Sequence, residues 1–350
     1  MSSDTPALLV DLDAVERNIA RLQRHLDEQG IASRPHIKTH KLPQIARMQI
    51  DAGAVGITCQ KLGEAEVMAD AGIDDILISF PLVGARKLSR LVDLTRRVRV
   101  TVSGDSEPIA RGLSVALAGA GLECDFLVEC DTGAGRVGVQ TPEDAARLAE
   151  LVDTLPGLRF AGLMTYPTPD DGGAWLAAAR QACERAGLEV RVVSGGGSPR
   201  ALQTTKADGV TEHRSGTYVY GDRHCLANGS VPASDLALTI KATVVSRPTA
   251  ERAIIDAGSK ALTSDLVPQT PDARGHGLIL EYPEASIYML SEEHGHVDVS
   301  ACAGGPVVGE EVTIVPNHAC AAVNLYDEVI VTRGGEPLAV WPIAARGRSR

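Results

Sequence analysis

The chain has 350 residues, of which 44% are hydrophobic, 23% charged and only 3% aromatic, and its formal net charge is −11. This balance is typical of a globular protein and excludes a disordered chain or a fibrous repeat. The acidic charge and the few aromatic side chains argue against nucleic acid or a membrane as a partner. The seven cysteines form no CxxC pair, and no signal peptide or bilayer-spanning stretch is present, so we expect a cytoplasmic protein.

The first two thirds of the chain alternate helical and short apolar segments. Residues 11–29 are predicted to form a helix, because one apolar stripe recurs at helical spacing, at Leu12, Val15, Ile19, Leu22 and Leu26. Eight strands are predicted after it, at 33–38, 54–59, 75–80, 98–103, 124–130, 158–164, 189–194 and 209–214. Helices are expected between them, such as 61–71, 141–153 and 172–187. Eight such units predict an α/β fold, a (β/α)8 TIM barrel over residues 1–236, with a doubly wound open sheet as the alternative.

The pattern changes near residue 236. Strand-like segments follow with no long helix between them, at 237–249, 252–256, 277–281, 296–300, 311–315 and 328–332. Turn residues separate these segments. We therefore expect a β-strand-rich, antiparallel carboxyl-terminal domain over residues 237–350.

A lysine stands at the end of the first predicted strand. In a barrel, the carboxyl ends of the strands carry the functional residues. The strand ends in Arg-Pro-His-Ile-Lys-Thr-His-Lys, and alternation places His36 and Lys38 on one face. A lysine at the barrel mouth loses its proton easily and can form a Schiff base. The alternative is a solvated lysine on a basic surface loop.

Glycine and hydroxyl residues follow the last two predicted strands of the barrel, at Ser194, Gly195, Gly196, Gly197, Ser198, Gly216, Thr217 and Tyr218. The loops after strands seven and eight are the recurrent phosphate site of this fold, and glycine amides approach a phosphate closely. A phosphate site opposite a reactive lysine predicts one cofactor, pyridoxal 5′-phosphate.

Two further strand ends offer contacts to that cofactor. Arg136 lies among glycines after the fifth strand, where its guanidinium can bind the phenolate oxygen of the cofactor or a substrate carboxylate. Tyr166 follows the sixth strand and can face the cofactor ring, although a buried tyrosine of the core is the alternative.

His318 and Cys320 form a candidate metal site in the carboxyl-terminal domain. They are two residues apart, so on an extended segment both side chains leave the same face. Imidazole and thiolate suit zinc, and manganese or magnesium is possible if the thiolate is a weak ligand. Because two ligands leave the coordination sphere open, such an ion would be catalytic.

The sequence resembles the family of D-threonine aldolase and eukaryotic-type D-serine dehydratase. These are fold-type III pyridoxal phosphate enzymes, related in fold to alanine racemase. The resemblance extends over nearly the whole chain, through motifs at 5–7, 34–41, 135–138, 195–198, 214–218, 256–260, 291–295 and 316–320. It implies that Lys38 is the Schiff-base lysine, that Arg136 contacts the cofactor, and that His318 and Cys320 hold a divalent metal near the substrate β-hydroxyl.

The resemblance also implies a reaction class. We expect a lyase for small β-hydroxy D-amino acids that cleaves them, as D-threonine aldolase does, to glycine and an aldehyde. The first alternative is dehydration of D-serine to pyruvate and ammonia. An epimerase or racemase, a non-catalytic pyridoxal phosphate carrier and an unrelated barrel enzyme for a phosphorylated substrate are the others. The general base stays open, and a homodimer is expected only by analogy with alanine-racemase-like enzymes.

Overall fold

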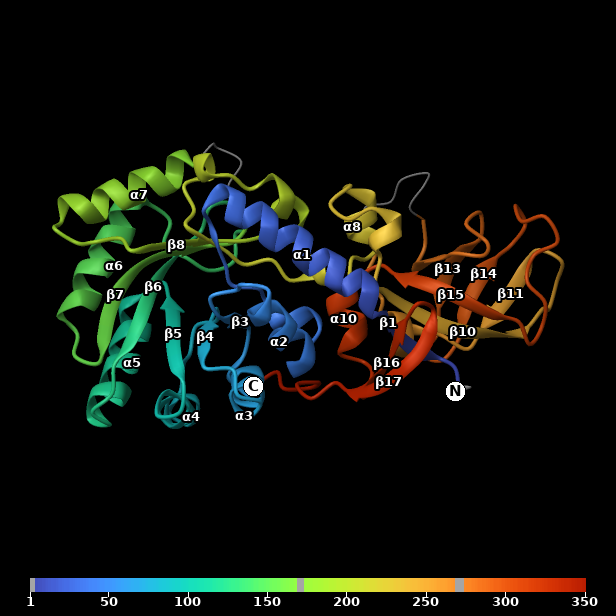
Figure 1. Ribbon diagram of the computed structural model, residues 1–350, viewed down its shortest axis with the longest axis horizontal. Coiled ribbons are helices and arrows are strands. Elements are labelled where there is room, and N and C mark those ends of the chain that lie inside the picture. The colour runs from blue at the N-terminus through green and yellow to red at the C-terminus, as the bar shows by residue number, and fades with distance from the viewer. Residues whose placement is uncertain (1–3, 169–172, 268–273) are drawn as a thin grey trace. The chain divides into compact units, whose positions relative to one another are not determined.

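A computed structural model describes residues 4–168, 173–267 and 274–350 (Figure 1). The chain divides into two compact units. Unit 1 comprises Met1–Ala20, Thr39–Leu42 and Thr217–Gly347, and unit 2 comprises Arg21–Lys38, Pro43–Gly216 and Arg348–Arg350. The division differs from the ranges 1–236 and 237–350, because strand β1 (Ala7–Asp11) pairs with strands from the carboxyl-terminal third. Among the described residues, no helix combines the length and the apolar character that a membrane crossing needs.

Unit 2 is built around eight parallel strands in the order β2-β9-β8-β7-β6-β5-β4-β3. Their bounds are β2 Ala32–Ser33, β3 Ile57–Cys59, β4 Asp75–Ile78, β5 Arg99–Gly104, β6 Cys124–Cys130, β7 Leu158–Thr165, β8 Val192–Gly195 and β9 Glu212–His213. A parallel bridge between His36 and Thr58 joins the two ends of this order. Across the same seam the Val55 N–H donates to the Ser33 carbonyl at 2.9 Å. The predicted (β/α)8 barrel is therefore confirmed, and the open doubly wound sheet is excluded.

Helices alternate with these strands along the chain, and α4 to α7 lie outside the strands in Figure 1. They are α1 Leu12–Gln29, α2 Pro43–Asp51, α3 Leu62–Asp70, α4 Ala85–Thr95, α5 Glu107–Gly119, α6 Pro142–Thr154 and α7 Ala174–Arg185. The apolar stripe predicted for the first helix is buried at all five positions. Helix α6 packs on β6 and β7, and its first turn is capped by Thr141, whose side chain accepts a hydrogen bond from the Asp144 N–H. The prediction for α7 began at residue 172, which lies outside the described residues.

The first predicted strand, 33–38, is wrong beyond Ser33, apart from an isolated bridge at His36. Strand β2 ends at Ser33, and Ile37–Thr39 form a 3-10 turn. Pro35 has no N–H to continue a ladder, and the Lys38 N–H donates to Nδ1 of His36 at 3.3 Å instead of to a neighbouring strand. Strand alternation therefore does not determine where His36 and Lys38 point.

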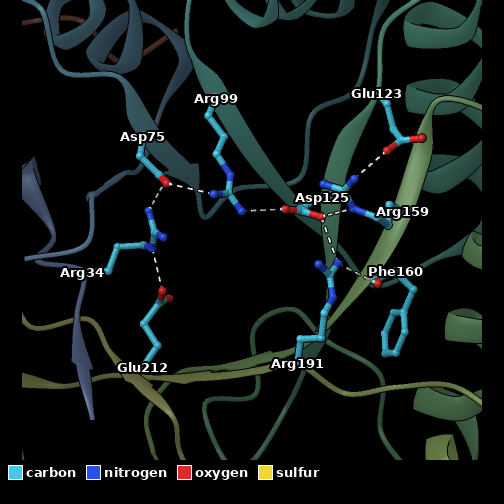
Figure 2. Close-up of polar contacts among 9 residues, drawn as sticks. All are labelled: Arg34, Asp75, Arg99, Glu123, Asp125, Arg159, Phe160, Arg191 and Glu212. Atoms are coloured by element: carbon cyan, nitrogen blue, oxygen red, sulfur yellow. Dashed lines mark hydrogen bonds and ion pairs between the residues drawn. The ribbon is translucent and has the colours of Figure 1, made fainter. Parts of the chain in front are cut away.

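A ring of charged residues lies at the amino-terminal ends of strands β4 to β9 and includes Arg34, which directly follows β2 (Figure 2). Arg34 bonds Asp75 at 2.5 Å and Glu212 at 2.7 Å. Asp125 accepts from three arginines, Arg99, Arg159 and Arg191. Burial opposes ionisation of Asp125, but the hydrogen bonds from these arginines hold its pKa below the usual value. This end of the barrel is thus occupied by ion pairs, which leaves the carboxyl ends of the strands for chemistry.

Unit 1 holds a mostly antiparallel sheet. Its further strands are β10 Leu238–Ser246, β11 Arg252–Ile255, β12 Gly277–Ile279, β13 Ser286–Leu290, β14 Gly295–Asp298, β15 Glu311–Pro316, β16 Glu328–Arg333 and β17 Glu336–Pro342. All six predicted strands are present, whereas β1, β13 and β17 were not predicted. The predicted antiparallel carboxyl-terminal domain is confirmed. It contains one parallel pair, because β1 from the start of the chain enters between β10 and β16 and runs parallel to β16. The described residues of the unit also form three short helices, α8 Arg223–Ala227, α9 Ser259–Leu262 and α10 Ala319–Val323.

Candidate active site

A cavity lies at the carboxyl ends of the barrel strands in unit 2. The side chains around it belong to nine residues, His36, Lys38, Gln60, Ser79, Glu129, Arg136, Met164, Tyr166 and Arg214. Gln60 and Ser79 directly follow β3 and β4, whereas Glu129 and Met164 are each the second-last residue of a strand. The strand-end rule applied to the sequence therefore identifies the correct edge of the barrel.

His36 and Lys38 both reach this cavity, although they do so from a turn. His36 is 5% exposed, and its Nδ1 accepts the Lys38 N–H. Its Nε2 lies 3.0 Å from Oε1 of Gln60. An imidazole that accepts at Nδ1 carries its proton at Nε2, so His36 donates to Gln60. The ring thereby ties the backbone of Lys38 to the cavity wall.

Tyr166 lies near both predicted cationic residues of the site. Lys38 Nζ is 5.7 Å and Arg136 Cζ is 5.2 Å from the centre of the Tyr166 ring. The loop that carries Arg136 is shaped by Asp131, whose Oδ1 accepts the N–H groups of Gly133 at 3.0 Å and Gly135 at 3.1 Å. These backbone hydrogen bonds also lower the pKa of Asp131. Three predicted cofactor residues thus lie close together in the lining of the cavity.

Glu129 is a buried carboxyl group in the cavity wall. It is 3% exposed, and its Oε2 has no hydrogen-bond partner among the described residues. Burial raises its pKa to about 7, against the opposing charges of Arg214 and Arg136. A buried polar atom without a partner is rare in a folded protein. The free oxygen and the two guanidinium groups fit a bound molecule that is both polar and charged.

The predicted phosphate site after β8 is only partly available. The Gly196 N–H donates to Oγ1 of Thr168 at 2.9 Å, so it is already used. The N–H groups of Gly197 and Ser198 donate no hydrogen bond within the part of the chain that the structure describes. Gly197 has φ +134°, a conformation that other residues rarely adopt. The turn therefore offers two adjacent amides to an anion, as a phosphate requires.

The remaining predicted phosphate residues fall into different parts of the fold. Gly216 is the last residue of its segment of unit 2, whereas Thr217 and Tyr218 belong to unit 1 and begin a 3-10 turn. Ser194 is fully buried, and its hydroxyl bonds Glu212 and Arg214. Its side chain is thus engaged inside the barrel.

His318 and Cys320 lie where a strand passes into a helix in unit 1. The expected extended segment is wrong, because β15 ends at Pro316 and α10 begins at Ala319. The two side chains nevertheless meet. A hydrogen bond with Cys320, followed by one with Asp265, raises the pKa of His318 to about 9. The Cys320 sulfur also lies 3.1 Å from Oγ1 of Thr39.

His318 and Cys320 suit a metal ion that keeps some of its coordination positions open to solvent or substrate. Within residues 4–168, 173–267 and 274–350, no cluster of three or more histidine, cysteine or acidic side chains could hold a metal. A structural zinc site needs four protein ligands, so His318 and Cys320 do not form one. Two ligands fit a catalytic ion whose other positions are filled by solvent or substrate.

Sequence reasoning missed several residues of the cavity, namely Gln60, Ser79, Glu129, Met164 and Arg214. Each of them lies at or just after the end of a barrel strand. The same rule that identified Lys38 would have found them if it had been applied to every strand. Asp265 was missed as well, and no local pattern connects it with His318.

Comparison with known proteins extends over both parts of the chain. The amino-terminal domain of alanine racemase matches residues 10–224, and a family described as a serine dehydratase domain matches residues 237–332. The chain is 36% identical to D-threonine aldolase of an Arthrobacter species, over 99% of this chain and 94% of that protein. It is 34% identical to D-threo-3-hydroxyaspartate dehydratase of Delftia sp. (strain HT23), over 92% of each. The crystal structure of D-threonine aldolase from Filomicrobium marinum superposes with a TM-score of 0.87 at 36% identity, covering 99% of this chain and 97% of that one.

Proposed function

Since the chain belongs to the fold-type III pyridoxal phosphate enzymes related to D-threonine aldolase and alanine racemase, we propose that it is a lyase for β-hydroxy D-amino acids. The family predicted from the sequence motifs is thereby confirmed. The proposed reaction is retro-aldol cleavage to glycine and an aldehyde. The observation that carries the proposal is the cavity at the barrel mouth, which is lined by Lys38, Tyr166 and the guanidinium groups of Arg136 and Arg214.

The residues of the cavity suit pyridoxal 5′-phosphate. When bound, this cofactor supplies an electron sink for the bonds at the substrate Cα. Lys38 offers the amine that would attach it, and the amides of Gly197 and Ser198 offer hydrogen bonds to its phosphate. Arg136 offers a guanidinium to an anionic oxygen, either the phenolate of the cofactor or a substrate carboxylate.

The chain's own residues also hold a proton and form the wall of this cavity. Glu129 keeps a proton up to about pH 7 because it is buried. His36 holds the turn that carries Lys38. Tyr166 is 38% exposed and forms part of the wall beside Lys38 and Arg136. These groups orient a small zwitterionic substrate, and they leave several candidates for the general base.

We also propose that His318 and Cys320 bind a divalent metal, with zinc, manganese and magnesium as candidates. When bound, such an ion lowers the pKa of a coordinated hydroxyl. A β-hydroxyl that loses its proton favours cleavage of the Cα–Cβ bond, whereas a hydroxyl that leaves gives dehydration. The metal motif therefore serves either reaction.

Dehydration is the second candidate function. The relatives named above include a D-threo-3-hydroxyaspartate dehydratase at 34% identity, close to the 36% of the aldolase. A non-catalytic carrier of the cofactor is disfavoured, because it would need neither the carboxyl-terminal sheet nor the histidine–cysteine pair. We further propose a homodimer, by analogy with alanine-racemase-like enzymes, which sedimentation velocity would test.

One experiment separates these functions. The purified enzyme, supplied with pyridoxal 5′-phosphate and each metal in turn, is incubated with a panel of D- and L-β-hydroxy amino acids. Aldehyde, glycine, keto acid and ammonia are measured in the same samples. Equal amounts of glycine and aldehyde from D-substrates support the aldolase. Keto acid and ammonia support the dehydratase, inversion of the substrate without other products supports an epimerase, and no change at all contradicts a lyase.

A further inference from the structure

Two buried residues of the barrel, Ser194 and Glu212, connect the charged ring with the cavity. Glu212 Oε2 accepts a hydrogen bond from Nε of Arg34 at 2.7 Å, the contact drawn in Figure 2. Glu212 Oε1 accepts one from the Ser194 hydroxyl at 2.6 Å. Glu212 is 5% exposed and Ser194 is 0% exposed. One carboxylate oxygen of Glu212 therefore bonds the charged ring, through Arg34, and the other bonds Ser194 on the side of the cavity.

The direction of these hydrogen bonds is determined by chemistry. An ionised carboxylate only accepts, so the Ser194 hydroxyl donates its proton to Glu212. The lone pairs of Ser194 Oγ are then free to accept the Nε–H of Arg214, at 2.9 Å. The Ser194 hydroxyl therefore bridges the negative charge of Glu212 and the positive charge of Arg214. In a buried setting such a chain strengthens each of its hydrogen bonds.

Arg214 is held on two of its three nitrogens. Besides the bond from Nε, its Nη2 donates to the Thr165 carbonyl at 2.5 Å and to the Ser194 carbonyl at 3.4 Å. No described residue accepts a hydrogen bond from Nη1, and Arg214 lines the cavity that Lys38 also lines. The guanidinium is thus fixed in direction, with donors left for a bound molecule.

We propose that Ser194 and Glu212 are positioning residues, which orient Arg214 so that its Nη1 donates a hydrogen bond to the bound cofactor. The inference rests on the proposed function, since it takes pyridoxal 5′-phosphate as the bound molecule. It gives the side chain of Ser194 a different role from the phosphate contact expected from the sequence. A hydroxyl that already bonds Glu212 and Arg214 has no hydrogen left for a phosphate.

The test measures cofactor affinity and colour. The cofactor-free full chain is titrated with pyridoxal 5′-phosphate, and the affinity and the position of the visible absorbance band are recorded. Ser194→Ala removes the acceptor of the Arg214 Nε–H, so we expect about tenfold weaker affinity and a displaced band. Ser194→Thr keeps the hydroxyl and restores both. Glu212→Gln removes the charge and one acceptor, and it displaces the band in the same direction as Ser194→Ala.

Asp75→Asn is the matched control. It breaks the ring on the far side of Arg34 and touches neither Ser194 nor Arg214. We expect it to lower the melting temperature while the affinity and the band stay as in the parent. An equal displacement in Asp75→Asn would mean that Ser194 and Glu212 merely support the barrel, which overturns the inference.

The inference and the proposed function fail in different ways. An unchanged affinity and band in folded Ser194→Ala overturns the inference while the parent enzyme still binds the cofactor. If Ser194→Ala does not fold, Glu212→Gln decides the question by the same two measurements. A parent chain that binds no pyridoxal 5′-phosphate contradicts the proposed function itself.

Discussion

Asp265 Oδ2 lies 2.5 Å from Nδ1 of His318, across 53 residues of sequence. A carboxylate at Nδ1 holds the imidazole in one orientation and directs the proton to that nitrogen. The other nitrogen, Nε2, is then the one available to a metal. Carboxylate–histidine pairs of this kind raise the basicity of the ligating nitrogen and fix its direction.

The first prediction concerns this pair. Asp265→Asn should weaken binding of zinc by about 10-fold or more, because the amide cannot hold the histidine as a carboxylate does. Isothermal titration of the metal-free enzyme with zinc measures the affinity. Asp327→Asn is a suitable control, since Asp327 is an exposed partner of Arg346. Equal zinc affinity in the parent and in Asp265→Asn would contradict a role of Asp265 at a metal.

The second prediction concerns the attachment of the cofactor. Lys38→Ala should abolish the visible absorbance of the purified protein, because Lys38 is the lysine that lines the cavity. Borohydride reduction followed by peptide mapping should place the label on the peptide that contains Lys38. Lys260→Ala is the control, since Lys260 forms an exposed ion pair with Glu293. A label on Lys41 or Lys260 would show that the assignment is wrong.

The third prediction concerns the phosphate turn. Gly197→Ala forces a side chain onto a residue at φ +134°, which costs about 1–3 kcal/mol or rotates the two free amides. Affinity for pyridoxal 5′-phosphate should fall at least several-fold. Gly187→Ala is the control, because Gly187 also has a positive φ and lies outside the cavity. If both variants keep the affinity of the parent, the phosphate binds elsewhere.

The fourth prediction is a pH dependence. Burial raises the pKa of Glu129 from 4.5 to about 7. The cofactor-free folded chain thus holds a proton that the unfolded chain releases, so the free energy of unfolding should fall as pH rises from 4.5 to 7. The shift corresponds to about 3 kcal/mol. Urea unfolding at several pH values should show a shallower fall in Glu129→Gln than in the parent, and identical slopes would contradict the prediction.

The fifth prediction concerns the metal. Exhaustive chelation should stop turnover and leave the visible absorbance intact, and added metal should restore the activity. Cys320→Ala should weaken metal binding, since it removes one of two proposed protein ligands. Cys320→Asp should retain some binding and favour harder ions such as manganese. Full turnover by enzyme that elemental analysis finds free of metal would contradict a metal-assisted reaction.

The sequence by itself determined the parallel α/β class of the first two thirds of the chain and the edge at which its chemistry lies. Eight buried apolar runs between helices predict parallel strands, because each run must bury both faces. The closure of these strands into a barrel was decided by the tertiary structure, through the parallel bridge between His36 and Thr58. The carboxyl ends of those strands then bring Lys38, Arg136 and Tyr166 together, whatever the details of the loops. Ordered motifs over the whole chain were likewise sufficient to identify the family.

Only the tertiary structure decided which side-chain and backbone groups are still available for binding. Gly196 and Ser194 belong to a glycine-rich phosphate motif in the sequence, yet Thr168 uses the amide of the first, and Glu212 and Arg214 use the hydroxyl of the second. In the same way, Asp265 meets His318 through a contact between residues far apart in the chain. Such pairings depend on how distant strands and turns pack, which local spacing does not encode.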